Sequence, residues 1–529
     1  MTTKTVSYWT QQPTLPSTTF TGILFLHQNF GRFKTKLLYR CVPTNKNDPV
    51  CVIPYHAPLG FFKKVTNKYV LFHYVEPGTY PGVKHCSGQL DSVFGNIDDL
   101  HSYYDYLLYS KSLFFNNAWS RQRFDPLPLP LSNPNLLYDI SSENFNLAPV
   151  EDVFTIDSKD TIDFDDALQF QMSENGSTFC VSVYITCVAH VLVKLFGSSS
   201  SSSSESSADW IYLLQHFASN ASTVYLPHRR IPMLIDAVSK QATLSAQSSE
   251  PRLCIVVRFS YDWHSLEFLH SEVAFVQARV RYNWDWQQGD LYASPLHEFT
   301  RRLNKDSTGH WIEGDSRNTV AYWMIRYNQF MTEYMQSHSA FAWFRGSPST
   351  IDSIATPELV HGENLNLNHS HPSLKFMFGQ LSASDEKLLV PMTNPMRRCV
   401  DLFNQFCLLF HKTIPENDKL LQYFHHLIPL MNQNLKSITK VQRNCRLLDH
   451  FQLNQEGINN REYTGIVFHK QNDPGCARGY FYSVFFRDLG VYLSYKTTAL
   501  LTEGKHLFRL YYFKDALQTK QKICISCVK

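Results

Sequence analysis

The 529-residue sequence predicts a multidomain α+β protein, with small β-rich modules at both ends and a mixed α/β core between them. The chain is too long for one compact core. Segments 15–56, 62–95 and 460–515 are rich in β-branched and aromatic residues broken by turn residues, which is typical of short strands. Between about 148 and 450 the pattern opens with strands and becomes helical, as in 317–338 and 397–412.

The β-rich N-terminal region reads as two small barrels or sandwiches, within residues 1–60 and 61–135. The second module continues into a helical stretch at 98–115 and a proline-rich linker at 125–135. The core spans 148–450, and the last module spans 455–529. A serine tract at 197–210 cannot pack into a core, so we expect a flexible surface loop, with phosphorylation as an alternative role.

Composition limits the function classes. A net charge of +3 means that any nucleic-acid surface is local rather than global. The first residues lack a secretory pattern, and no apolar run reaches about 18 residues, so we expect neither export nor a membrane span. The twelve cysteines are expected to be reduced. Cys524 and Cys527 lack a second ligand pair, so we expect two ordinary thiols on a strand rather than a zinc site.

The stretch FTIDSKDTIDFDDALQF, residues 154–170, carries the strongest chemical signal. It contains five aspartates, Asp157, Asp160, Asp163, Asp165 and Asp166. A solvated acidic turn does not need the interleaved Ile162, Phe164 and Leu168, which we expect to be core residues. Half-buried carboxylates repel one another unless a cation neutralises them, and hard oxygen ligands select Mg²⁺, Mn²⁺ or Ca²⁺. Ala167 and the missing glycine argue against a calcium EF-hand loop, so the pattern predicts a magnesium site for phosphate chemistry.

The same stretch resembles the signature of the ribonuclease II / ribonuclease R family, which includes the exosome's catalytic exonuclease. The family pattern is close to T-I-D-x-x-x-A-x-D-x-D-D-A, and Asp160 is the one aspartate outside it. Three later segments are similar to further family motifs in the same order: STVYLPHRRIPML (222–234) to S-x-Y-L-P-x-x-x-I-P-M-L, QARVRYNW (277–284) to S-x-A-R-L-T-Y, and MTNPMRRCVDL (392–402) to F-T-S-P-I-R-R-Y-x-D-L.

This resemblance implies an RNB-type mixed α/β catalytic core, two cold-shock-like OB barrels before it and an S1-like OB barrel after it. It also implies a 3′→5′ exoribonuclease that needs Mg²⁺ or Mn²⁺ and hydrolyses single-stranded RNA to nucleoside 5′-monophosphates. RNA is then the expected partner of a monomeric protein without membrane contact. The expected compartment is the cytoplasm, with the nucleus as the alternative.

The resemblance also assigns roles to individual residues. The expected metal ligands are Asp157, Asp163, Asp165 and Asp166, and Asp165 and Asp166 are also expected to act in catalysis. Arg397 falls where the family has an arginine that faces the scissile phosphate. Arg398 is expected to bind substrate or to form a salt bridge. Tyr225 and Tyr282 fall where family tyrosines stack on the last nucleotide, with a core position as the alternative.

Several positions depart from the family pattern. Cys187 replaces an aspartate, and Gln405 and Phe406 replace a His-Arg pair. Ala321 and Tyr322 stand where the family has paired glutamates. None of these changes removes a proposed ligand or Arg397. Two alternatives therefore stay open: an RNA-binding protein that keeps the fold with weak or no turnover, and a structural scaffold.

Overall fold

The structure is a computed structural model. It describes residues 19–57, 65–82, 85–111, 113, 149–196, 216–308, 315–345, 376–381, 388–410, 419–453, 461–472, 479–517 and 519–528. The expected linker at 125–135 and the serine tract at 197–210 lie outside these residues. The chain divides into two compact units. The first combines Met1–Phe114, Tyr225–Arg230 and Ser437–Lys529, and the second combines Phe115–Val224 and Ile231–Lys436.

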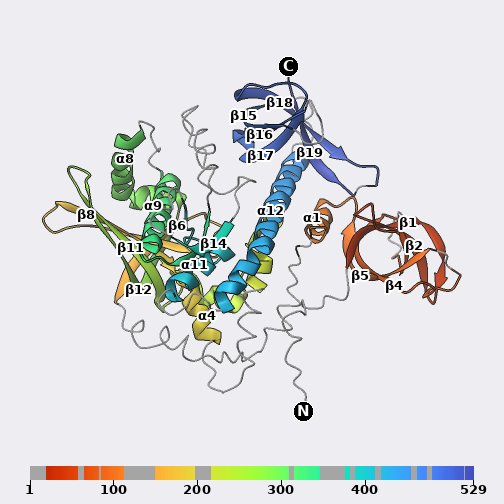
Figure 1. Ribbon diagram of the computed structural model, residues 1–529, viewed down its shortest axis with the longest axis horizontal. Coiled ribbons are helices and arrows are strands. Elements are labelled where there is room, and N and C mark those ends of the chain that lie inside the picture. Colours follow the sequence, from red (N-terminus) through yellow and green to blue (C-terminus); the bar gives the residue numbers. More distant parts are fainter. Residues whose placement is uncertain are drawn as a thin grey trace, which may run out of the picture. The chain divides into compact units, whose positions relative to one another are not determined.

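The N-terminal strands form one closed barrel, drawn in red and orange in Figure 1. Its strands are β1 (Phe20–Phe33), β2 (Lys36–Pro43), β3 (Cys51–Tyr55), β4 (Lys68–Val75) and β5 (Cys86–Asn96), in the order β1-β2-β3-β5-β4. The prediction of two N-terminal barrels is therefore wrong. β1 pairs with β4, and β3 with β5, across the predicted boundary near residue 60. Neither half alone has enough strands to satisfy its edges.

The predicted helix after this barrel is confirmed as α1 (Leu100–Tyr109). Its N-cap is Asp99, whose side chain accepts a hydrogen bond from the Ser102 N–H. The buried Tyr103 hydroxyl donates to the Gln521 carbonyl at 3.0 Å, which ties this helix to the C-terminal strands of the same unit.

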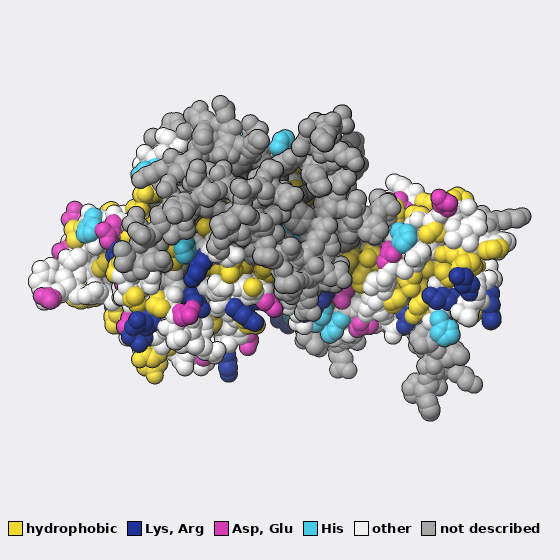
Figure 2. Space-filling model, turned by 90° about the horizontal axis from the view of Figure 1, so that it is seen from below, with side chains coloured by type: hydrophobic (Ala, Val, Ile, Leu, Met, Phe, Trp, Pro, Cys, Tyr) yellow, Lys and Arg dark blue, Asp and Glu magenta, His cyan; other side chains and the backbone are white. Residues whose placement is uncertain are grey.

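Figure 2 shows hydrophobic and basic side chains gathered side by side on the surface of the N-terminal barrel.

The C-terminal region forms a five-stranded antiparallel sheet, as its strand pattern predicted. The strands are β15 (Glu462–Asn472), β16 (Tyr480–Phe486), β17 (Val491–Thr497), β18 (Gly504–Lys514) and β19 (Gln521–Cys527), in the order β17-β16-β15-β18-β19. The Cys527 N–H donates to the Tyr495 hydroxyl at 3.4 Å, so the two edge strands approach each other as in an OB-like barrel. Cys524 and Cys527 lie on a strand, β19, as expected, and neither forms a disulfide.

The second unit is built on another closed five-stranded barrel (Figure 1). Its strands are β6 (Val150–Asp157), β7 (Asp166–Met172), β8 (Thr178–Thr186), β11 (Arg252–Asp262) and β12 (Phe268–Asp285), in the order β11-β12-β6-β7-β8. Of the strand pairs in this barrel, β6–β12 is parallel and the others are antiparallel. One face of the strands buries a small cluster that includes Val153, Ala167 and Val256, and the other face packs into the main core.

Helices and two short strand pairs complete the second unit. They are α4 (Val188–Phe196), β9 (Val224–Leu226), β10 (Arg229–Ile231), α6 (Asp236–Ala242), α7 (Trp286–Tyr292), α8 (Ser294–Thr308), α9 (Ser316–Ser337), β13 (Phe341–Arg345), β14 (Phe376–Gln380), α11 (Cys399–Phe410) and α12 (Lys419–Leu453). The tip of the β9–β10 pair and the end of α12 belong to the first unit. The helices predicted from 317–338 and 397–412 are confirmed as α9 and α11. Among the described helices, none is long and apolar enough to cross a membrane.

Candidate active site

The aspartate motif forms a strand, a loop and a second strand of the barrel. β6 ends at Asp157, and β7 begins at Asp166. These two strands are neighbours in the barrel, so the first and last aspartates of the motif come close together. Ile156, Ala167 and Leu168 are buried and anchor the two strands.

The loop between the strands departs from one expectation. Ile162 was predicted to be a core residue, but its side chain is 68% exposed, so that prediction is wrong. The loop leaves the sheet after Asp157, and strand alternation does not continue through it. The loop is held instead at its end, where the Phe164 N–H donates to the Thr243 hydroxyl at 3.1 Å.

Four of the five aspartates are withdrawn from solvent to different degrees. Asp165 and Asp166 are buried, and Asp157 and Asp163 are partly buried. Asp160, the residue outside the family pattern, is exposed. Burial raises the pKa of Asp157 to about 6 and the pKa values of Asp165 and Asp166 to about 7. The negative charge of Asp157 raises the pKa of Asp166 further, and the positive charge of Arg397 acts against all three shifts.

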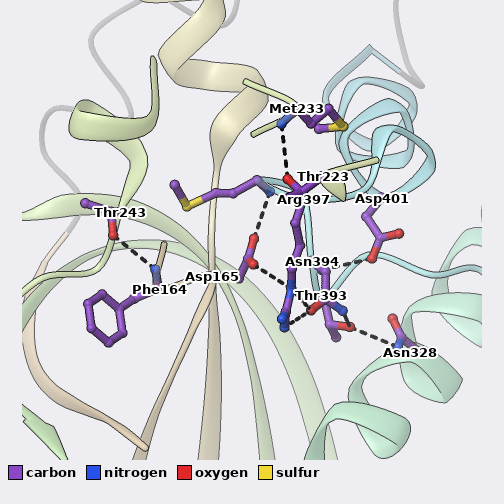
Figure 3. A network of polar contacts seen from close by, with 11 residues as sticks. Phe164, Asp165, Thr223, Met233, Thr243, Asn328, Thr393, Asn394, Arg397 and Asp401 are labelled. Carbon is purple, nitrogen blue, oxygen red and sulfur yellow. Dashed lines mark hydrogen bonds and ion pairs between the residues drawn. The ribbon is translucent and has the colours of Figure 1, made fainter. Parts of the chain in front are cut away.

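Arg397 lies beside Asp165 although the two residues are far apart in the sequence (Figure 3). The Arg397 Nε atom is 3.1 Å from Asp165 Oδ2. The other carboxylate oxygen, Oδ1, accepts a hydrogen bond from the Met396 N–H at 2.8 Å. The Arg397 side chain is 42% exposed, so a group that enters from solvent can reach its guanidinium.

A tight turn positions Arg397 just before α11. The Asn394 carbonyl accepts from the N–H groups of Arg397 and Arg398 at 3.2 Å and 2.9 Å. The Asn394 Oδ1 atom accepts from Arg397 Nε at 2.7 Å and also from Nη2. The fully buried Asp401 accepts from the Asn394 N–H at 2.8 Å. Asn before Pro395 suits such a turn at a helix start.

These carboxylates suit a hard divalent cation in their chemistry. Asp157 Oδ2 and Asp165 Oδ2 are buried and accept no hydrogen bond, and the only contact given above for either oxygen is the ion pair of Asp165 Oδ2 with Arg397. Within the described ranges, however, no three or more His, Cys, Asp or Glu side chains are grouped closely enough to hold an ion. The donor atoms therefore fit Mg²⁺ or Mn²⁺, but this conformation does not assemble a complete ligand set.

The two tyrosines lie in different surroundings. Tyr225 belongs to the first unit and is 48% exposed, and its N–H donates to Gln442 Oε1 at 2.6 Å. Tyr282 is 60% exposed and stacks on Trp284, with ring centroids 5.7 Å apart.

The structure does not bring Tyr282 to the aspartates. It pairs with Phe154 on β6, whereas Asn283 bonds to Thr155, so Tyr282 and Thr155 project from opposite faces of the sheet. Thr155 also bonds to Asp157, which places the Asp157 carboxylate on the Thr155 face.

Two other arginines of the second unit, Arg398 and Arg252, have partners of their own. Arg398 is partly buried, and its backbone forms a β-bridge with Ser222. The pKa of Arg345 is lowered mainly by burial, and the positive charge of Arg398 lowers it further. Arg252, at the start of β11, lies 3.4 Å from Glu250 and donates to the Lys240 carbonyl.

Two departures from the family pattern, Cys187 and Gln405, meet at one buried place. Cys187, Gln405 and Phe406 are all buried. The Gln405 side chain donates to the Thr186 carbonyl at 2.7 Å and accepts from the Ala189 N–H at 3.2 Å, which holds the backbone on both sides of Cys187. A glutamine and a cysteine thus form a neutral buried group where the family motifs have charged residues.

Sequence reasoning missed the residues that position the arginine. Asn394 and Asp401 stand inside the quoted segment MTNPMRRCVDL but received no role there. The Asn-Pro pair at a helix start was the available signal. The contact of Asn394 with Arg397 depends on the turn geometry, which the sequence pattern does not show.

The comparisons agree with this arrangement. Residues 149–284, which include the aspartate motif and all five barrel strands, match the family model of the RNB domain. No curated protein matches the chain. Mycoplasma genitalium RNase R in complex with ribose methylated single-stranded RNA has the same fold, with a TM-score of 0.61 and 15% sequence identity over 96% of this chain and 89% of that chain.

Two further solved structures share the fold. Yeast Ssd1, a pseudonuclease, matches with a TM-score of 0.53 and 14% identity over 91% of this chain and 65% of that chain. An active-site mutant of the Dss1 exoribonuclease from Candida glabrata matches with a TM-score of 0.52 and 15% identity, over 79% of this chain and 61% of that chain. The fold therefore occurs in an active nuclease type and in a pseudonuclease, and the site itself must discriminate between them.

Proposed function

The chain is a divergent member of the RNB-domain family, and from this premise we propose that it is a metal-dependent 3′→5′ exoribonuclease. Its substrate would be single-stranded RNA, and its products nucleoside 5′-monophosphates. One observation carries the proposal: the ion pair that joins buried Asp165 to the solvent-accessible Arg397, beside two further carboxylates with raised pKa values.

The metal ligands would be Asp157, Asp163, Asp165 and Asp166. When bound, Mg²⁺ or Mn²⁺ supplies a more acidic water and screens the charge that develops on the phosphate. Arg397 contributes N–H donors that bind phosphate oxygens and stabilise negative charge in the transition state. The Met396 N–H and the Asn394 side chain hold Asp165 and Arg397 in position for these roles.

RNA as the substrate is supported by the structural neighbours. The RNase R of M. genitalium was solved with single-stranded RNA and also with double-stranded RNA. Exposed Tyr225 offers a ring on which a base can stack without sequence preference, whereas Tyr282 faces away from Asp157 and gives no such support at the site.

A second candidate is an RNA-binding protein without turnover. It is favoured by the incomplete ligand group within the described residues and by the resemblance to a pseudonuclease. The departures at Cys187, Gln405 and Phe406 give it less support, because all three side chains are buried and Gln405 is satisfied by backbone groups.

A degradation assay separates the two candidates. The full chain is incubated with 3′-labelled single-stranded RNA and Mg²⁺, and release of labelled mononucleotide is followed. We expect wild type to degrade the RNA and Asp165→Asn to be slower by about 10²–10⁴-fold. Asp160→Asn is the matched control, since Asp160 is exposed and lies outside the motif, and it should retain wild-type activity. Equal inertness of wild type and Asp165→Asn, with RNA binding intact, would establish the second candidate instead.

A further inference from the structure

Arg397 approaches Asp165 without giving it a hydrogen bond. Its Nε atom is 3.1 Å from Asp165 Oδ2, but its N–H donates to Asn394 Oδ1 at 2.7 Å. Asp165 Oδ2 is buried and accepts no hydrogen bond. The guanidinium of Arg397 therefore attracts the Asp165 carboxylate by its charge, while its Nε–H donates to Asn394.

Asn394 is held in the orientation that this arrangement requires (Figure 3). Its backbone N–H donates to buried Asp401 at 2.8 Å, and its Nδ2 donates to the Thr393 hydroxyl at 2.9 Å. Thr393 in turn accepts from Asn328 on α9 at 3.3 Å. With Nδ2 directed to Thr393, the amide oxygen faces Arg397 and accepts from both Nε and Nη2.

We propose that Asn394 is a positioning residue that holds the Nε–H edge of Arg397 away from Asp165, so that Asp165 Oδ2 stays available as a ligand for a divalent cation. The inference rests on the proposed metal-dependent function. Without the Asn394 oxygen, the Nε–H can turn to Asp165 Oδ2, which lies 3.1 Å from Nε, and an Arg–carboxylate hydrogen bond would compete with the metal for the same lone pairs. Serine, which stands here in the family motif, has a shorter side chain and would not reach the guanidinium in the same way.

The test is a titration of the metal-free full chain with Mn²⁺ in the absence of RNA, with free Mn²⁺ measured by electron paramagnetic resonance. Wild type, Asn394→Ser, Arg397→Gln and the double variant are compared. We expect Asn394→Ser to bind Mn²⁺ about 10-fold more weakly, which is the usual effect of losing a partner that orients a ligand. In the Arg397→Gln background the same Asn394→Ser change should have no further effect, because the guanidinium that would compete with the metal is gone.

Two controls complete the design. Asn432→Ala removes a partly buried amide of the same unit. This amide bonds to the backbone of Phe376 and Ile428 and is not among the proposed site residues, so the change should leave Mn²⁺ affinity within about twofold. If Asn394→Ser does not fold, Asn394→Asp keeps an acceptor oxygen for Arg397 and should bind Mn²⁺ at least as tightly as wild type.

The outcomes are distinguishable. Wild-type affinity in Asn394→Ser, or an equal loss with and without Arg397, would overturn the role of Asn394 while leaving the proposed function intact. Weaker binding in Asn394→Asp would do the same. Failure of wild type to bind Mn²⁺, or binding that Asp165→Asn does not weaken, would overturn both this inference and the metal-dependent function.

Discussion

The carboxyl groups of Asp157, Asp165 and Asp166 lie in surroundings that favour their neutral forms. Burial is the main cause, and repulsion between Asp157 and Asp166 adds to it. Arg397 offsets only part of this effect, because the pKa values remain raised to about 6 and about 7. At neutral pH the metal-free site therefore carries unfavourable charge that a bound cation would relieve.

This arrangement predicts how metal-free stability depends on pH. A raised pKa means that the folded state holds protons that the unfolded state releases, so the associated stability is present below about pH 4 and is lost as pH rises through about 6 to 7. Thermal unfolding in chelator should show wild type losing stability relative to Asp165→Asn between pH 5 and about pH 8.

The comparison with the variant is necessary because buried histidines act in the opposite sense. Burial lowers the pKa values of His190 and His216 to about 4, so they add stability as pH rises towards about 6.5. These groups are the same in both proteins, so their effect cancels in the difference. A difference that does not change with pH would contradict the burial of an ionisable Asp165.

At the scale of elements, α7 crosses closely over β6 at Gly289. A Cβ atom there would lie 2.5 Å from Ile156 Cγ2 and 2.5 Å from Ser316 Oγ. Ile156 directly precedes Asp157, so this contact also sets the end of β6 in the site. Gly289→Ala should lower the free energy of unfolding by about 1–3 kcal/mol in urea denaturation. At Gly379 an added Cβ would lie 4.0 Å from Phe344 Cε1, which is an ordinary contact, so Gly379→Ala should change the free energy of unfolding by less. Equal losses would refute the packing argument.

The buried junction between β8 and α4 gives a second prediction at this scale. Gln405 satisfies the Thr186 carbonyl and the Ala189 N–H on either side of Cys187, and the His190 N–H at the start of α4 bonds to the Cys187 side chain. Cys187→Asp, which restores the residue type of the family motif, should bury a charge that the His190 N–H offsets only in part, and should cost about 3 kcal/mol or more. Cys187→Ala should cost about 1 kcal/mol. Similar losses for both variants in chemical denaturation would show that charge is not the cause.

At the scale of the whole molecule, metal binding should appear in the stability of the folded chain. A ligand that binds only the folded state at 100 times its Kd adds about 2.7 kcal/mol. Mg²⁺ or Mn²⁺ should therefore raise the Tm of wild type at pH 7.5 and should raise that of Asp165→Asn much less. An unchanged Tm together with no RNA binding would favour the scaffold alternative.

Local patterns in the sequence predicted much of the secondary structure. The helices α1, α9 and α11, the strands of the C-terminal sheet and the mixed core all follow from short-range periodicity. The two-barrel prediction at the N-terminus was wrong because β1–β4 and β3–β5 pairing is non-local. Ile162 was misplaced for a related reason, since its exposure depends on where the loop leaves the barrel.

By itself, the sequence determined the RNB-family resemblance, the order of strands and helices, and the carboxylates that any cation would have to use. Only the tertiary structure decided that Tyr282 faces away from Asp157, that the departures at Cys187 and Gln405 meet in one buried group, and that Asn394 directs Arg397 beside Asp165. The physical reason is distance along the chain: periodicity and motifs act over a few residues, whereas hydrogen bonds and charges act between any groups that folding brings into contact.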